Sequence, residues 1–168
     1  MAENNGSSLA IAAANLFETA VWWVSANKIK ELSHDQLLYR PGEGRNHIYW
    51  LFGHIIVSAD LAPYLNGTQP VIDRRYFDYF DMNTIPNNNG EGYPDLEEMT
   101  TAFDRVVSGT LDELKSLNDN ALLLPLTKSL PEPLRPYFAT RHELVLGFAT
   151  HISYHAGQIA TILKMIGK

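Results

Sequence analysis

The chain contains no cysteine among its 168 residues, which excludes disulfide bonds, thiolate metal ligands and a cysteine nucleophile. It also has no uninterrupted run of about 18 apolar residues, so the sequence predicts no membrane-spanning helix. The opening segment, MAENNGSS, lacks the basic and apolar regions of a secretory signal peptide. We therefore expect a cytoplasmic protein that has no membrane partner.

Basic residues are few and scattered along the chain. The 13 Lys and Arg residues against 19 Asp and Glu residues give a net charge of −6. Proteins that bind the phosphate backbone need clustered Lys and Arg, so we expect no nucleic-acid partner. Three catalytic motifs are also absent, namely G-x-S-x-G, a glycine-rich phosphate loop and H-E-x-x-H. The common hydrolase, nucleotide-binding and zinc-protease signatures are thereby excluded.

Four long stretches have the spacing of apolar residues that is typical of helices. They cover about 9–32, 47–65, 94–117 and 141–166. Ser7 or Ser8 can cap the first of them, Asn46 the second, and Thr140 with Glu143 forms a capping box before the last. With 45% hydrophobic and 19% charged residues, the composition suits one globular domain spanning 1–168. The sequence predicts an all-α four-helix bundle.

Two of the connections between these helices are long, so we expect crossover links instead of simple hairpins. The connection 66–93 is rich in Asn, Gly and Pro, which excludes a long helix there. A connection of this length within a compact domain is usually functional or a crossover. Its aromatic residues indicate that it packs on the bundle: Tyr76, Phe77, Tyr79 and Phe80. Pro63 is expected to truncate or kink the second helix.

Three of the six histidines point to a metal site. His151 and His155 are four residues apart, so their imidazoles leave the same face of the last helix. His54 lies on an apolar face of the second helix and can oppose them. Three neutral imidazoles can bind a divalent transition metal and leave one coordination position open. The alternative is a hydrogen-bonded structural pair, because imidazoles on a core face need satisfied nitrogens.

Other polar residues are weaker candidates for the surroundings of this site. His47 shares a face with His54 but lies two turns away, so we expect it at a pocket mouth and not on the ion. Gln158 lies beside the face of the pair and is expected to orient polar groups there. Glu18 and Trp22 on the first helix are expected to reach the site, and no catalytic residue is assigned. His142 falls on the opposite face of its helix and is excluded as a ligand.

The chain resembles the DinB-like superfamily of metal-binding four-helix bundles along nearly its whole length. The segments that carry the resemblance are LYRPGEGRNHIYWLFGHI, GYPDLEEMTTAFDRVVSGTLDEL and THISYHAGQIATILKMIG. The resemblance implies a divalent metal, zinc or nickel, held by His54, His151 and His155, and a homodimer. Its members include thiol S-transferases that use bacillithiol, mycothiol or glutathione, and metal-dependent hydrolases or isomerases. A low-molecular-weight thiol is therefore an implied cofactor.

Two functional hypotheses follow. The first is a metal-dependent enzyme of the thiol S-transferase or hydrolase type, with an open metal position. The second is a non-catalytic, stress-related bundle in which the metal only joins two helices or supports dimerisation. A metal-free bundle is a third possibility. The first helix has more apolar residues than one stripe needs, so either the connection 66–93 or a second subunit must cover it.

Overall fold

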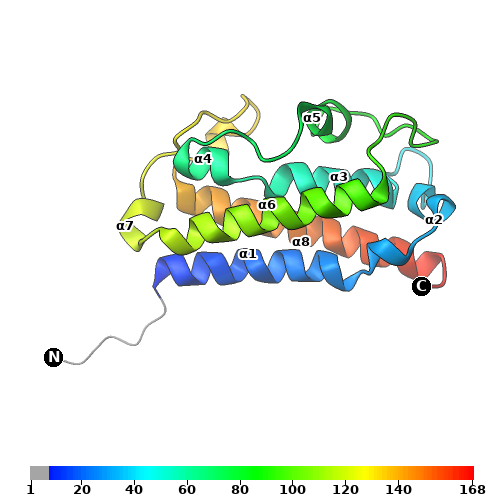
Figure 1. Cartoon of the computed structure of the whole chain (residues 1–168), viewed down its shortest axis with the longest axis horizontal. Helices are drawn as coiled ribbons and strands as arrows, with labels where there is room; N and C mark the ends of the chain where they lie inside the picture. Colours follow the sequence, from blue (N-terminus) through cyan, green and yellow to red (C-terminus); the bar gives the residue numbers. More distant parts are fainter. Residues whose placement is uncertain (1–7) are drawn as a thin grey trace.

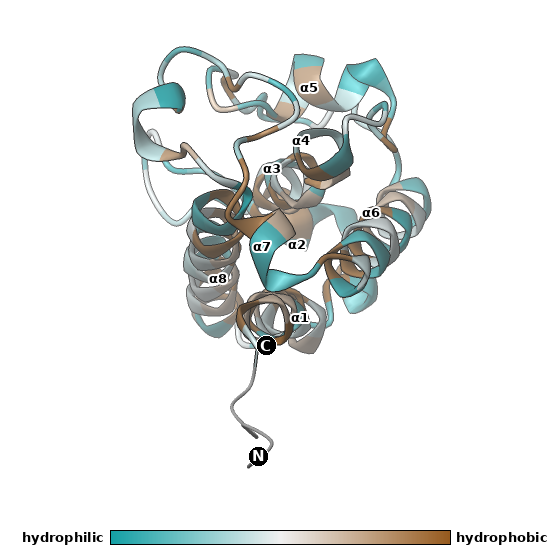
Figure 2. Ribbon diagram, turned by 90° about the vertical axis from the view of Figure 1, so that its left-hand side faces the viewer, coloured by the Kyte–Doolittle hydropathy of each residue, from teal (hydrophilic) through white to brown (hydrophobic). Residues whose placement is uncertain are grey.

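The computed structural model describes residues 8–168, and four long helices make up its body (Figure 1). They are α1 (Leu9–Ala26), α3 (Ile48–Ala59), α6 (Leu96–Ser116) and α8 (Arg141–Met165). In the end-on view of Figure 2, α1 and α3 lie on one diagonal, and α6 and α8 on the other. Each helix of one diagonal packs on both helices of the other. The predicted all-α four-helix bundle is confirmed.

Short elements fill the connections. They are η1 (Ile29–Glu31), α2 (His34–Leu38), α4 (Ala62–Asn66), α5 (Arg74–Phe80), α7 (Asp119–Leu122) and η2 (Arg135–Tyr137). Within residues 8–168 the only β-type pairing is one isolated antiparallel bridge between Pro125 and Thr140. The two long connections, 66–93 and 118–140, both return across the same side of the bundle, above α3 and α8 (Figure 1).

The first helix is shorter than the sequence suggested. It ends at Ala26, and Lys28 then adopts a left-handed conformation with φ of 50° before the short η1. Asn27 stabilises this break, since its side-chain amide donates to the carbonyls of Trp23 and, across the bundle, Ala156. The N-cap is Ser8, whose hydroxyl accepts from the backbone of Ile11. The alternative cap, Ser7, lies outside the described residues.

The second predicted helix, 47–65, is divided into α3 and α4. Its N-cap is His47 and not Asn46, because the His47 ring nitrogen accepts from the Trp50 backbone. The division falls at Asp60, three residues before Pro63, whose missing N–H prevents a continuous hydrogen-bond ladder. Thr110 of α6 stabilises the break, since its hydroxyl donates to the Ala59 carbonyl at 2.8 Å.

The connection 66–93 packs on α3 through α5, as its aromatic residues indicated. Tyr76 and Phe80 are fully buried, and Phe80 lies against Gly53 of α3. A β-carbon at position 53 would lie 2.4 Å from the Phe80 ring, so this close approach requires glycine. The connection therefore covers α3, on the side of the bundle away from α1 (Figures 1 and 2).

The outer face of α1 remains uncovered in the described chain. Trp22 is 57% exposed and Trp23 is 53% exposed, with their rings 4.8 Å apart in an edge-to-face pair. Neither tryptophan belongs to the core, because Phe17, Val21 and Val24 already fill the inward stripe of the helix. Of the two ways to cover this face, the connection 66–93 is excluded by its position.

Two stretches are long and apolar enough to cross a membrane by length and composition alone, namely Leu9–Glu31 and Ile48–Asn66. The search for uninterrupted apolar runs missed both, because isolated polar residues interrupt them. Of the most apolar window in the second stretch, 89% is buried inside the bundle. This stretch comprises α3 and α4 and belongs to the folded core. In the first stretch 39% is buried, and α1 packs on both α6 and α8.

Candidate metal centre

The two histidines of α8 leave the helix on one face. The helix begins with the predicted capping box, in which the Thr140 hydroxyl accepts from the Glu143 backbone and the Glu143 carboxylate accepts from the Thr140 backbone. This box sets the start of a helix that continues without interruption to Met165. The side chains of His151 and His155 therefore project toward the same neighbouring helix, which is α3.

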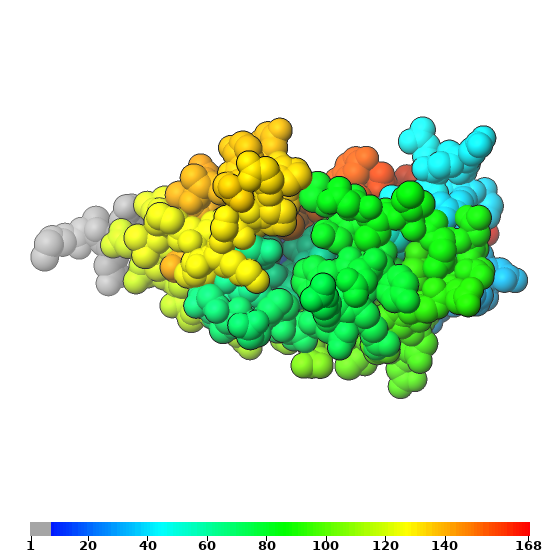
Figure 3. All heavy atoms as spheres, turned by 90° about the horizontal axis from the view of Figure 1, so that it is seen from above, coloured from blue at the N-terminus to red at the C-terminus, as the bar shows by residue number. Residues whose placement is uncertain are grey.

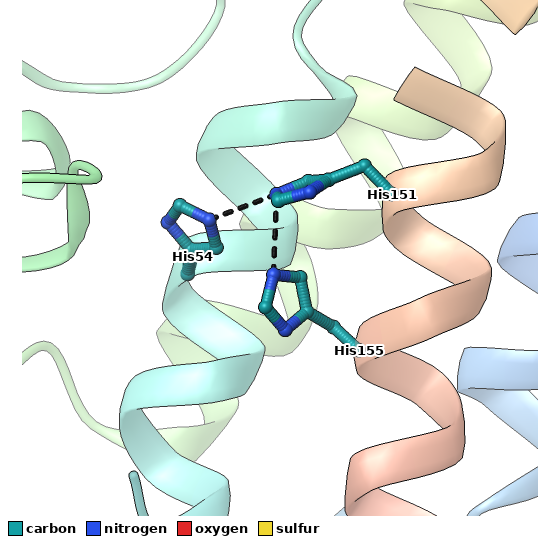
Figure 4. Close-up of side chains that lie close together, drawn as sticks. All are labelled: His54, His151 and His155. Atoms are coloured by element: carbon teal, nitrogen blue, oxygen red, sulfur yellow. Dashed lines mark hydrogen bonds between the residues drawn. The ribbon is translucent and has the colours of Figure 1, made fainter. Parts of the chain in front are cut away.

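His54 meets them from α3. Figure 4 shows its ring pointing across the gap to His151, with His155 one turn further along α8. The Nε2 atom of His151 lies 3.0 Å from Nε2 of His54 and 3.2 Å from Nε2 of His155. Nitrogen ligands placed tetrahedrally around zinc at about 2.0–2.1 Å are roughly 3.3 Å apart. Both separations are close to this value, and all three ligand nitrogens lie within 4.8 Å of one another.

The outer nitrogens of two of these rings are held by acceptors. Nδ1 of His54 donates to the Phe80 carbonyl at 2.7 Å, and Nδ1 of His155 donates to the Gln158 side-chain oxygen at 2.8 Å. Because a carbonyl oxygen can only accept, Nδ1 carries the proton in both neutral rings. Their Nε2 lone pairs therefore point at the shared centre, as in histidines that ligate a metal.

Packing fixes the ring planes as well. The Trp50 indole stacks on His54 with 4.8 Å between ring centroids and 9° between planes. Phe148 makes an edge-to-face contact with His151 at 6.1 Å. Gln158 is itself positioned by a hydrogen bond from its amide to the Tyr154 hydroxyl. The three imidazoles thus lie in a rigid arrangement within the bundle core.

Burial keeps the three imidazoles neutral. Desolvation, with a smaller contribution from the neighbouring imidazoles, lowers the pKa of His151 to about 4 and that of His155 to about 4. The hydrogen bond to Gln158 partly opposes the lowering of the His155 pKa. The pKa of His54 is also lowered by burial, against the opposing effect of its hydrogen bond to Phe80. Only neutral imidazole ligates a metal, so these pKa values favour metal binding at neutral pH.

The other residues proposed from the sequence lie elsewhere, apart from Gln158. His47 is fully buried and lines no part of the site; Nε2 donates to the Asn87 carbonyl at 2.9 Å and anchors the connection 66–93. Glu18 and Trp22 are exposed on α1, so the expectation that they reach the site is wrong. Their helix presents Phe17 and Val21 inward instead. Within residues 8–168, no fourth His, Cys, Asp or Glu joins the cluster.

A cavity of about 310 Å³ opens beside the histidines and includes His54 and His151 in its wall. Its other walls come from α3 and α4, the end of α5, the segment 128–138 and α8. Figure 3 shows the surface hollowed between the segment 128–138 and the α4–α5 region. The sequence did not predict this cavity, because its walls come from both long connections. The only hint in the sequence is the cluster of prolines in 125–136, which indicates an irregular segment that can form such a wall.

The histidine geometry and the bundle agree with a comparison of the sequence with known families. The DinB superfamily profile matches residues 20–159. The chain belongs to the DinB superfamily. A crystal structure of a conserved protein from Enterococcus faecalis has a similar fold, with a TM-score of 0.67. The similarity covers 97% of this chain and 100% of that one, at 15% sequence identity. No curated protein matches the chain in sequence. The fold of this DinB superfamily member is thus shared with a protein of low sequence identity.

Proposed function

We propose that this DinB superfamily protein is a metal-dependent enzyme of the thiol S-transferase or hydrolase type. His54, His151 and His155 would hold zinc or nickel, both of which accept imidazole ligands. One observation carries the proposal, namely that two of the three histidines also form the wall of a cavity. An ion held by three histidines would have one coordination position left over, and the cavity would give a small molecule access to it.

The surroundings of the histidines suit a reaction that is kept apart from bulk water. A divalent ion lowers the pKa of a thiol or water bound to it and supplies a nucleophile at neutral pH. The phenyl rings of Phe77, Phe138 and Phe148 line the cavity and would exclude water from an apolar substrate. Because the chain has no cysteine, any reacting thiol has to enter as a small molecule. Bacillithiol, mycothiol and glutathione are thiols of suitable size.

A structural role for the metal is the second candidate. The outer nitrogens of His54 and His155 bind a backbone carbonyl and an amide, so neither of these two ligands is held by a carboxylate. An ion at this place joins α3 to α8 and would stabilise the bundle even without chemistry. The two candidates differ in one respect, which is whether an added thiol reaches the ion.

Metal analysis followed by a thiol titration tests the proposal. We expect about one divalent ion per chain in the purified protein. After loading with nickel, addition of glutathione, cysteine or bacillithiol should change the visible absorption of the ion, and one of these thiols should then react faster with a small electrophile. The His142→Ala variant is the matched control and should behave like the wild type. A bound ion whose spectrum no thiol or other small anion alters would favour the structural role.

A further inference from the structure

The wall of the cavity beside the metal centre contains a second polar group, Asp60. Asp60 is the C-cap of α3 and follows His54 by six residues, which is a rise of about 9 Å along a helix. Both residues belong to the cavity wall. Between them the wall is mostly apolar, with Val57 and Leu61 from the helices and Leu130, Leu134 and Phe138 from the opposite segment. The same cavity wall thus contains histidine and, about 9 Å further along the helix direction, a carboxylate.

The two oxygens of Asp60 have different environments. Oδ2 accepts from the backbone N–H groups of Val71 at 2.8 Å and Ile72 at 3.5 Å, which ties the connection 66–93 to the end of α3. Oδ1 is buried and is the only such side-chain oxygen or nitrogen in residues 8–168 without a hydrogen-bond partner. The residue as a whole is 4% exposed. A buried carboxylate oxygen without a donor is unfavourable, so Oδ1 is suited to receive one from a ligand.

The charges around Asp60 favour a cation. Asp81 also lines the cavity; burial raises the pKa of the Tyr64 hydroxyl, and the carboxylates of Asp81 and Asp60 raise it as well. Lys128 is the one basic residue in the wall. It is exposed, and no ion pair of residues 8–168 joins it to Asp60. Burial raises the pKa of the Asp60 carboxyl, and the charge of Lys128 partly opposes this shift. Two acidic groups therefore face one solvated ammonium group.

We propose that Asp60 binds a protonated amine of the small molecule whose other end reaches the metal centre. The implied substrate or thiol has an apolar body about as long as the distance between His54 and Asp60 along α3, with an amine at its far end. An ammonium group satisfies a buried carboxylate in both charge and hydrogen bonding, which a neutral donor does only in part. The assignment of the metal-bound end rests on the proposed function, whereas the amine site itself does not.

Asp60→Asn is the decisive variant. An Asn side-chain oxygen can still accept from Val71, so the tie to the connection is kept, while the unpaired position receives an NH₂ group that repels an amine. The probes are 6-amino-1-hexanethiol and 1-hexanethiol, titrated by calorimetry into the zinc-loaded protein. The wild type should bind the amino compound about tenfold more tightly or better, as expected for a hydrogen bond to a charged group. In Asp60→Asn the dissociation constants of the two compounds should differ by no more than about twofold.

Two further variants keep the test decisive if Asp60→Asn folds poorly. Asp81→Asn removes the other acid of the wall and should keep most of the preference for the amine. Lys128→Met leaves Asp60 in place and removes the competing cation, so amine binding should become tighter. The proposal is overturned if the wild type shows no preference, if Asp60→Asn keeps it, or if Lys128→Met weakens amine binding. In each case Asp60 would serve only as the tie to Val71.

A metal-free titration separates this inference from the proposed function. Hexylamine and hexanoate are matched in length and opposite in charge, and neither needs the ion to enter the cavity. After chelation of the metal, the protein should be stabilised against thermal unfolding by hexylamine and not by hexanoate, and Asp60→Asn should abolish the difference. If this holds while no thiol reaches the metal, the proposed function fails and the amine site stands. If thiols bind but hexylamine has no effect, the amine site fails alone.

Discussion

The Nδ1 atom of His54 donates a hydrogen bond of 2.7 Å to the backbone carbonyl of Phe80, 26 residues further along the chain. One metal-ligating candidate is therefore oriented by the connection 66–93 and not by its own helix. The contact depends on Gly53, because the Phe80 ring lies where a β-carbon at that position would be. A glycine next to the first histidine thus allows the connection to approach and hold that histidine.

We expect Gly53→Ala to weaken metal binding together with stability. The added β-carbon would lie 2.4 Å from the Phe80 ring, so either the ring or α5 must move. Overpacking of this kind destabilises by about 1–3 kcal/mol, and displacement of the Phe80 carbonyl removes the acceptor of His54. Gly157→Ala is the matched control, since a β-carbon there meets nothing within 4 Å. Urea unfolding and metal titration of both variants measure the two effects. Unchanged metal affinity in a destabilised Gly53→Ala protein would show that the Phe80 contact does not matter for the ion.

Replacing a histidine of the cluster should reduce the bound metal, whereas replacing a histidine outside the cluster should not. His151→Ala or His155→Ala should reduce the bound metal from about one ion per chain to a small fraction, because each removes a ligand that no neighbour replaces. His142→Ala should retain the metal, since His142 lies outside the cluster. Elemental analysis after dialysis measures this, with circular dichroism to confirm that each variant is folded. Retention of the ion by the His155 variant would contradict the three-ligand site.

Gln158 should matter through its hydrogen bond to His155. Gln158→Leu removes the acceptor of Nδ1 and should weaken metal binding by about 10–100-fold, which is typical of residues that orient a ligating histidine. Gln158→Glu keeps an acceptor at the same place and should bind at least as well as the wild type. Competition with a coloured chelator gives the affinities. Equal affinities in all three proteins would make Gln158 an ordinary surface amide.

The metal-free protein should lose stability as the pH falls below about 6.5. The pKa of His151 and of His155 is lowered to about 4 in the folded state, whereas an unfolded histidine has a pKa of about 6.5. Between these values the unfolded chain binds more protons, so the free energy of unfolding decreases as the pH is lowered. The contribution is fully present above about 6.5 and is lost on the way to about 4. Its slope reaches about 1.36 kcal/mol per pH unit for each such histidine.

Urea unfolding of the chelator-treated protein at several pH values measures this slope. His151→Asn should have a shallower slope by about one proton, because it lacks one of the perturbed groups. A stability that is flat between about pH 6.5 and 4.5 in the wild type would contradict the burial of neutral imidazoles in the absence of metal.

Local patterns were enough to predict the four helices and the histidine cluster. The spacing of His151 and His155 determines that they share a face, and apolar periodicity turns that face toward the core. Contacts between distant segments were not accessible in the same way. The break at Lys28 depends on Asn27 reaching Ala156, and the capping role of His47 is fixed by a carbonyl at Asn87.

The cavity illustrates the same limit. Asp60 lies within the predicted helix 47–65, where the apolar spacing assigns it no role, although a buried carboxylate needs partners. Its partners are backbone groups of Val71 and Ile72, whose position depends on how the connection folds over α3. The opposite wall comes from 128–138, a segment whose prolines only indicated an irregular connection. The spacing of apolar residues therefore does not predict that Asp60 and the segment 128–138 line one cavity, and only the folded structure shows it.

We expect the protein to be a homodimer joined through the outer face of α1. Ile11, Trp22 and Trp23 are more than half exposed on this helix, and the connection 66–93 lies on the other side of the bundle. A two-fold interface brings the same patch from both chains together, so the two tryptophan pairs would bury each other. Sedimentation at micromolar concentration should show a species of about twice 18.9 kDa. Trp22→Glu combined with Trp23→Glu should give the monomer, while Ile85→Glu, at a position that is 91% exposed in the connection, should not. A wild-type species near 18.9 kDa would leave the tryptophan face of α1 without a partner chain.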